Sequence, residues 1–319
     1  LHKVDKPRAA REQKTFFREP VSRVARRPGS QQLTFTRDVG GSEFSQIFKF
    51  DPEAGEATML SDGKSRNGSL RWDRRGERIA YQSTRRNGAA NDLWVMRPDD
   101  PETAELVVTA TDGSYWAPVE FSQTGTRLLA WNRISKPDIR ACLIDLDTGA
   151  VTVLSGGGQT KSRNVPIAFD DNNNGFWLVT NQGSEFDQLA WQSLARGAAP
   201  EILTGDIPWN VGEVVISDDR RRMAFIANED GVSRLYLMNP RTREYRVVDS
   251  MPTGVAFGLE FSPDGSKLAM TLNMPRAPSD AYALRLGRDP LKYGRLMRWT
   301  KSETGGIKTK QFSVPDLVR

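Results

Sequence analysis

The chain repeats one short pattern about every 47 residues. An apolar anchor is followed by a polar turn and then by a run of β-forming residues, most clearly in residues 261–270, FSPDGSKLAM. The anchor positions are 26, 72, 121, 169, 216 and 261, so successive copies are 46, 49, 48, 47 and 45 residues apart. A constant period of this length is typical of solenoids and propellers, and it constrains the fold more than any local pattern does.

The rest of each repeat identifies the unit. Short apolar-alternating runs at 47–50 and 58–60 flank the turn sequence DPEAG, and runs at 143–146 and 151–154 flank DTG. Four antiparallel strands in about 45 residues match a propeller blade better than a helical repeat. We therefore expect an all-β propeller of six four-stranded blades, with a seventh blade closed from the two termini as the alternative. The expected blades are at about 21–62, 66–111, 115–156, 163–205, 211–250 and 255–300.

Composition narrows the classes of protein. Hydrophobic residues make up 38% of the 319 residues, and we assign the anchors Trp72, Phe121, Phe169 and Phe261 to the core. The one cysteine, Cys142, excludes an intrachain disulfide and a CxxC metal site, and it is expected to be buried in a strand. No run of 18 apolar residues occurs, so we predict no membrane partner.

The charge is weakly basic. The chain has 45 basic and 40 acidic side chains and a net charge of +5. Because the two signs are interspersed, we read them as solvated surface charge and predict no nucleic-acid partner.

The chain lacks the residues of a hydrolytic site. Its single histidine, His2, falls in a polar N-terminal extension, 1–20, that we expect to be poorly ordered. A serine or cysteine nucleophile needs a well-placed base, and no G-x-S-x-G turn occurs. No His/Cys cluster could hold zinc, and the Asn-rich turn at 171–175 lacks a calcium-binding Glu at the twelfth position. We expect no catalytic residue, no metal and no cofactor.

The longer loops are the candidates for binding. If the strands of a blade follow chain order, the second-to-third and fourth-to-first connections share one edge, and they include 64–68, 85–92, 112–116, 156–165 and 206–212. Longer loops on a rigid scaffold commonly carry binding residues, and Arg and aromatic side chains are enriched at hot spots. The candidates for substrate or partner binding are Arg66, Arg85, Arg86, Tyr115, Trp116, Arg163 and Trp209.

A second set of candidates comes from the first strand of each blade. Alternation places the side chains near the anchors toward the propeller tunnel. These tunnel-lining candidates are Arg71, Glu120, Glu213 and Glu260. They could form a self-compensating lining or attract the α-ammonium group of a peptide.

Several stretches resemble one peptidase family. They include FFREP at 16–20, DGKSRNG at 62–68, NEDGVSRLY at 228–236 and WTKSETGG at 299–306. Together with the repeat, they are similar to the N-terminal propeller of acylaminoacyl-peptidase-like members of the prolyl oligopeptidase family. The repeat alone is also similar to that of the Tol-system periplasmic propeller proteins.

The family resemblance implies a non-catalytic domain. In such serine peptidases the propeller caps an α/β-hydrolase domain and restricts substrates to short peptides. Residues 301–319 then resemble the linker toward that domain, which is absent from this sequence. The partners implied are the hydrolase domain and short peptides, while the alternative is a self-standing propeller that binds proteins. We favour the cytoplasm. Because the chain begins with Leu1 rather than Met, removal of an N-terminal signal is the alternative, and it would place the protein in the periplasm.

Overall fold

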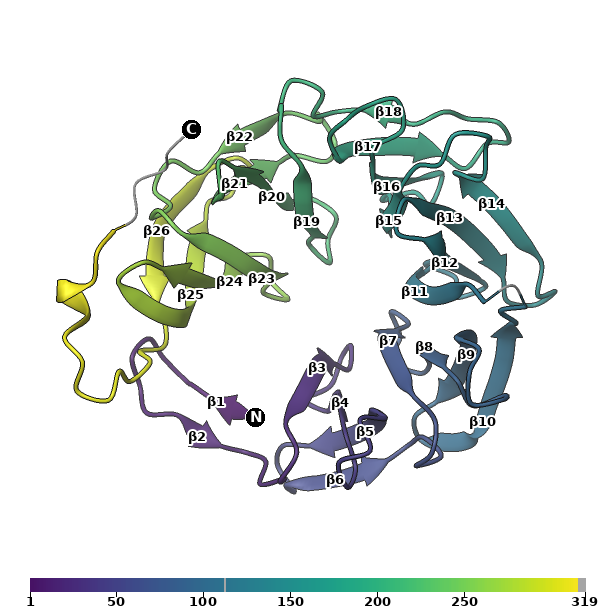
Figure 1. Cartoon of the computed structure of the whole chain (residues 1–319), viewed down its shortest axis with the longest axis horizontal. Coiled ribbons are helices and arrows are strands. Elements are labelled where there is room, and N and C mark those ends of the chain that lie inside the picture. Colours follow the sequence, from purple (N-terminus) through teal and green to yellow (C-terminus); the bar gives the residue numbers. More distant parts are fainter. Residues whose placement is uncertain (112, 315–319) are drawn as a thin grey trace. The chain divides into compact units, whose positions relative to one another are not determined.

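The fold is all-β. The computed structural model describes residues 1–111 and 113–314, and in these residues the single helical element is one 3-10 turn, η1 (Thr309–Gln311). Most of the strands belong to six four-stranded antiparallel sheets whose strands neighbour one another in chain order (Figure 1). The prediction of six four-stranded propeller blades is therefore confirmed for the described residues.

The first three sheets have the following strands. The first contains β3 (Val21–Arg26), β4 (Leu33–Arg37), β5 (Gln46–Asp51) and β6 (Glu56–Met59). The second contains β7 (Asn67–Trp72), β8 (Ile79–Ser83), β9 (Asp92–Arg97) and β10 (Asp100–Val108). The third contains β11 (Tyr115–Phe121), β12 (Arg127–Ser135), β13 (Asp138–Asp145) and β14 (Val151–Ser155).

The last three sheets repeat this order. The fourth contains β15 (Asn164–Phe169), β16 (Gly175–Thr180), β17 (Gln188–Ser193) and β18 (Glu201–Ile202). The fifth contains β19 (Val211–Ile216), β20 (Met223–Glu229), β21 (Val232–Met238) and β22 (Tyr245–Val247). The sixth contains β23 (Val255–Phe261), β24 (Lys267–Met274), β25 (Ala277–Leu286) and β26 (Tyr293–Arg298).

The chain divides into two compact units. The first unit consists of Leu1, Gln13–Gln182 and Ala190–Glu201, and the second of His2–Glu12, Gly183–Leu189 and the chain from Ile202 onward. Within the first unit, β7 contacts β3 and β11, and β15 contacts β11; within the second, β19 contacts β23. The first strands of consecutive sheets are therefore neighbours inside each unit.

The anchors differ in burial. Phe121 and Phe169 are completely enclosed, whereas Trp72 and Phe261 are half-buried. Trp72 packs against the hydrophobic cluster that contains Ile79, and Phe261 packs against the cluster that contains Leu268. The Trp72 indole donates a hydrogen bond to Thr34 Oγ1 at 3.0 Å, which satisfies its polar atom. Cys142 is fully buried in β13, as predicted, and burial raises the pKa of its thiol to about 12.

The turn between the first two strands keeps one geometry even where the sequence varies. Gly76, Gly125 and Gly265 have positive φ, and each donates its amide hydrogen to the carbonyl three residues before it. Asn173 and Arg220 occupy the same place with φ of 53° and 59° and make the same hydrogen bond. A non-glycine residue in this conformation costs roughly 1 kcal/mol, which the surrounding sheet tolerates.

A buried polar side chain lies near the start of every third strand. At four of these positions its oxygen accepts a hydrogen bond from a backbone N–H beyond the fourth strand of the same sheet. The donors are Gly63 to Gln46 at 3.0 Å, Ala110 to Asp92 at 2.7 Å, Ala256 to Ser233 at 2.9 Å and Ser302 to Asp280 at 2.8 Å. Each contact gives one amide beyond the sheet a hydrogen-bond partner inside the protein.

The N-terminal extension is ordered, contrary to the expectation for His2. That residue lies in β1 (His2–Lys3), which pairs with β2 (Glu12–Gln13). The amide of Lys14 donates to the carbonyl of Leu1 at 2.9 Å, and the amide of Arg8 donates to the carbonyl of Trp299 at 2.8 Å. Backbone pairing holds a segment that its polar composition alone did not predict to be ordered.

Replacing Gly175 with alanine should destabilise the protein. A Cβ at Gly175 would lie 2.4 Å from the Trp191 ring, whereas a Cβ at Gly158 would meet no atom within 4 Å. Because overpacking typically costs about 1–3 kcal/mol, we expect Gly175→Ala to lower the free energy of unfolding by about 2 kcal/mol. Denaturant unfolding of both variants measures this, and an equal effect of Gly158→Ala would contradict it.

Candidate functional site

The order of the strands sorts the loops onto two edges of each sheet. Because four antiparallel strands follow chain order, the first strand starts and the fourth strand ends at the same edge. The second-to-third connections lie there too. We call this the long-loop edge and the opposite one the short-turn edge.

Three arginines at the long-loop edge of the first unit stack on aromatic rings. The guanidinium of Arg66 lies 4.5 Å from the ring of Phe44, and that of Arg85 lies 5.5 Å from the ring of Trp94. Arg133 lies 5.0 Å from the ring of Tyr115. All three arginine side chains are exposed. We call these three arginines and their rings the Arg–aromatic set.

The pair of Arg133 and Tyr115 has additional contacts. Tyr115 stacks on Trp131 with ring centroids 5.4 Å apart, and Arg133 also lies 5.9 Å from the Trp131 ring. The Tyr115 hydroxyl lies 3.3 Å from Oε1 of Gln82, to which it donates a hydrogen bond. Stacking of this kind contributes about 0.5–1 kcal/mol at exposed sites and restricts the guanidinium, so it can meet an anion with less loss of conformational entropy.

The Arg–aromatic set is only partly foreseen by the sequence. Arg66, Arg85 and Tyr115 were candidates, whereas Phe44, Trp94, Trp131 and Arg133 were missed. Tyr115 pairs with Arg133 across β11 and β12, and Trp131 pairs with Ala117. The signal was present as alternation in Trp131 and Arg133, which place two side chains on the same face at the end of β12.

Arg86 has a structural role. Its Nε lies 2.8 Å from Asp92, whose side chain is fully buried, and its guanidinium also donates to the carbonyl of Ala110 at 3.2 Å. The hydrogen bond to Asp92 raises the pKa of Arg86 above its ordinary value. The arginine neutralises a buried carboxylate that holds the end of the sheet, so its charge is already engaged.

The remaining loop candidates are placed differently. Trp116 is 9% exposed and packs in the core with Phe121. Arg163 is exposed at the long-loop edge, and its backbone N–H donates to Asn181 Oδ1 at 2.8 Å. Trp209 is half-buried in the second unit. Of the predicted loop 112–116, residue 112 lies outside the described residues.

Two carboxylates of the predicted tunnel set bind backbone of the next sheet. Glu120 accepts a hydrogen bond from the amide of Phe169 at 2.8 Å. Glu213 accepts hydrogen bonds from the amides of Gly258 and Leu259 at 2.8 Å and 2.7 Å. The strands that donate these amides, β15 and β23, carry β-bulges nearby, and a bulge leaves backbone amides unpaired in its own ladder. These side chains therefore join neighbouring first strands.

The other two members of that set, Arg71 and Glu260, are accessible to solvent as residues, but their charged groups are surrounded by protein. Arg71 donates to the carbonyl of Leu70 at 2.8 Å and feels the like charge of Arg23 and the opposite charge of Glu120. Burial of the carboxyl, together with the charge of Asp218, raises the pKa of Glu260 above its ordinary value. The charge of Glu260 is thus the least compensated of the three carboxylates.

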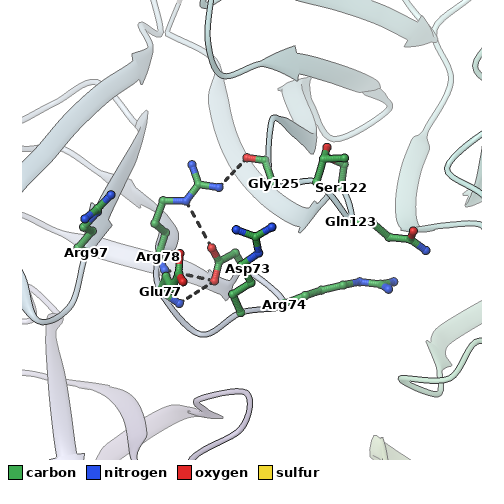
Figure 2. A pocket seen from close by; sticks show the side chains of 10 residues that line it. Asp73, Arg74, Glu77, Arg78, Arg97, Ser122, Gln123 and Gly125 are labelled. Atoms are coloured by element: carbon green, nitrogen blue, oxygen red, sulfur yellow. Dashed lines mark hydrogen bonds and ion pairs between the residues drawn. The ribbon is translucent and has the colours of Figure 1, made fainter.

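The short-turn edge of the first unit has a polar hollow of about 170 Å³ between the second and third sheets (Figure 2). Figure 2 shows Arg78 reaching Asp73 of its own turn and the carbonyl of Gly125 in the next sheet, at 3.3 Å and 2.6 Å. Arg74 lies 3.7 Å from Glu120. These contacts join two turns, so we assign the hollow a structural role.

The described residues contain neither a cluster of metal ligands nor a helix that could span a membrane. Within 1–111 and 113–314, no group of three or more His, Cys, Asp or Glu side chains is placed to hold a metal ion. In the same residues, no helix has the length and hydropathy needed to span a membrane.

Removing Arg86 should destabilise the protein more than removing Arg85. Arg86→Ala leaves the fully buried Asp92 carboxylate without its cationic partner, so we expect a clear fall in the midpoint of denaturant unfolding. Arg85→Ala loses a ring contact and a hydrogen bond to Tyr81 and leaves no buried charge unpaired, so its midpoint should fall less. Equal losses in denaturant unfolding would contradict the assignment.

Glu213 and Glu260 should differ in their effect on stability. Glu213→Ala loses two hydrogen bonds to a carboxylate and should cost about 2 kcal/mol.

For Glu260, a raised pKa in the folded state means that the free energy of unfolding falls as pH rises from the ordinary glutamate pKa through the raised one. Glu260→Gln should remove that part of the pH dependence. Unfolding measured from pH 4 to pH 7 tests both, and an unchanged slope for Glu260→Gln would contradict the second.

Comparison with known proteins identifies the fold. No family model and no curated protein sequence matches the chain. Among solved structures, it matches one from an analysis of two prolyl endopeptidases with a TM-score of 0.60 and 14% identity, covering 92% of this chain and 51% of that one. Prolyl oligopeptidase B from Galerina marginata, solved with a 25mer macrocyclization substrate, matches with a TM-score of 0.70 and 10% identity over 92% of this chain and 44% of that one.

A propeller of another kind matches as well. TolB from Acinetobacter baumannii has a TM-score of 0.59 and 14% identity, with 85% of this chain and 64% of that one covered. At these identities the likeness concerns the fold. This chain spans about half the length of the prolyl oligopeptidase structures that it matches, and its fold is the β-propeller that the sequence resemblance predicted.

Proposed function

We propose that the chain is the non-catalytic propeller domain of a serine peptidase, where it caps an α/β-hydrolase active site and admits short peptides. The observation that carries the proposal is the match of 92% of this chain to about half of each prolyl oligopeptidase structure. A propeller acts here by steric exclusion and positioning, so it needs no nucleophile or base of its own.

The arrangement of the chain supports docking through the long-loop edge. The first strand of the first sheet starts at this edge, and the last strand of the sixth sheet ends at it. A domain joined by a short linker after β26 would therefore meet the long-loop edge of that sheet first. Residues 315–319 of the predicted linker lie outside the described residues.

The chemistry of the long-loop edge of the first unit also suits docking. Arg66, Arg85 and Arg133 are exposed and held against rings, while the short-turn arginine Arg78 is already bound to a neighbouring turn. Arginine and aromatic side chains are the common anchors of protein interfaces. The Arg–aromatic set would contact carboxylates of the hydrolase domain or of a peptide.

The alternative is a self-standing propeller that binds a protein partner, and the match to TolB supports it. Sequencing the gene beyond the codon for Arg319 separates the two. A continuing reading frame with a G-x-S-x-G segment is expected for the peptidase, whereas a stop codon there would contradict it.

Charge reversal tests the docking edge. In a protein that carries the hydrolase domain, Arg66→Glu with Arg85→Glu should lower kcat/KM for short peptides at least fivefold, because acidic side chains would repel carboxylates of the partner. The matched control is Arg75→Glu with Arg97→Glu on the short-turn edge, which should change kcat/KM less than twofold. Exposed substitutions usually alter stability by less than about 0.5 kcal/mol, so the melting temperatures should stay close. Equal losses in both pairs would contradict the edge assignment.

A further inference from the structure

A cavity of about 550 Å³ lies at the long-loop edge of the sixth sheet, in the second unit. One wall is the β24–β25 hairpin with Arg276, Ala277 and Pro278, and the other is the segment after β26 that carries η1. Figure 1 shows this segment extending beyond β26 in yellow. The volume falls within the range of pockets that hold small ligands, about 300–1,000 Å³.

The charge of the lining is one-sided. Four cations line the cavity, Arg276, Arg298, Lys301 and Lys308, and no Asp or Glu is among the described lining residues. Arg298 is paired with Asp280, a buried carboxylate. The other three have no carboxylate partner in the described part of the chain, so an entering anion would meet uncompensated positive charge.

Asp280 holds the cavity wall in place. Its carboxylate accepts hydrogen bonds from Thr300 Oγ1 at 2.7 Å and from the amide of Ser302 at 2.8 Å. Burial opposes its ionisation, but the hydrogen bonds from Thr300 and Arg298 outweigh burial and keep the pKa of Asp280 below its ordinary value. Because Arg276 Nε also donates to the carbonyl of Phe312 at 2.9 Å, the segment is tied to the hairpin at both ends and the cavity is preformed.

The rest of the lining limits the kind of anion. Thr309 offers a hydroxyl and Gln311 an amide, whereas the hydroxyls of Ser302 and Thr304 already donate to the carbonyls of Ser279 and Ile307. Ile307, which is 60% exposed, adds an apolar surface beside Ala277 and Pro278. A carboxylate next to a small apolar side chain fits this combination of cations, polar donors and apolar carbon.

We propose that this cavity binds the C-terminal carboxylate of a short peptide. Lys301 and Lys308 would contact the carboxylate, and Ile307 would cover the last side chain. This goes beyond the capping role, because the chain of residues 1–319 alone would bind the peptide. The binding experiment can therefore fail while the capping role stands, and the reverse also holds.

Calorimetric titration of the 1–319 chain tests the proposal. The probes are an N-acetylated tri-alanine peptide with a free carboxylate, its C-terminal amide, and inorganic phosphate. We expect the free acid to bind at least tenfold more tightly than the amide, and more tightly than phosphate. Lys301→Gln with Lys308→Gln should weaken binding of the acid at least fivefold, with an unchanged melting temperature. Lys161→Gln, at an exposed loop position elsewhere, should leave binding unchanged.

Three results would overturn the assignment. Equal binding of acid and amide would remove the carboxylate from recognition. Undiminished binding by the double lysine variant would move the site elsewhere. Tighter binding of phosphate than of the acid would assign the cavity to a phosphate-bearing ligand instead of a peptide.

Discussion

Four of the six sheets share one contact, made by a buried polar side chain near the start of the third strand. The chain beyond the fourth strand of each of these sheets donates a backbone amide to that side chain. Gln46, Asp92, Ser233 and Asp280 each accept one of these amides inside the protein. An unpaired buried amide would cost about 1–3 kcal/mol, so each of these four contacts stabilises the chain beyond its sheet.

Structural contacts also engage several of the charged residues that the sequence suggests for binding. Arg86 is committed to Asp92, and the carboxylates of Glu120 and Glu213 are committed to amides of the following sheet. By contrast, Arg66, Arg85 and Arg133 are exposed and lie against the faces of rings, and Arg85 also forms a hydrogen bond with Tyr81. Charge at the long-loop edge is therefore either structural or exposed for recognition, and residue type alone does not separate the two.

Asp280 links the structural role to a binding role. Like Gln46, Asp92 and Ser233, it accepts a backbone amide from the chain beyond its sheet. Its hydrogen bonds also reach Thr300 and Arg298, and they hold the segment after β26. The cation-lined cavity exists because that segment is held against the β24–β25 hairpin. The cavity and the Arg–aromatic set both belong to long-loop edges, where an acidic ligand would meet positive charge.

The sequence by itself determined the period, the six blades and the burial of Phe121 and Phe169, because local strand alternation and turn chemistry repeat with the same spacing. It also placed Arg66, Arg85 and Tyr115 at the correct edge, since strand order follows the chain. Tertiary structure alone decided that Trp116 is core, that Arg86 is paired and that Trp131 and Arg133 join Tyr115. The residues near the start of the third strands are Gln, Asp or Ser in turn, so their shared role leaves no sequence motif. Their partners are backbone amides brought close only when the sheets form, and that is a property of three-dimensional packing.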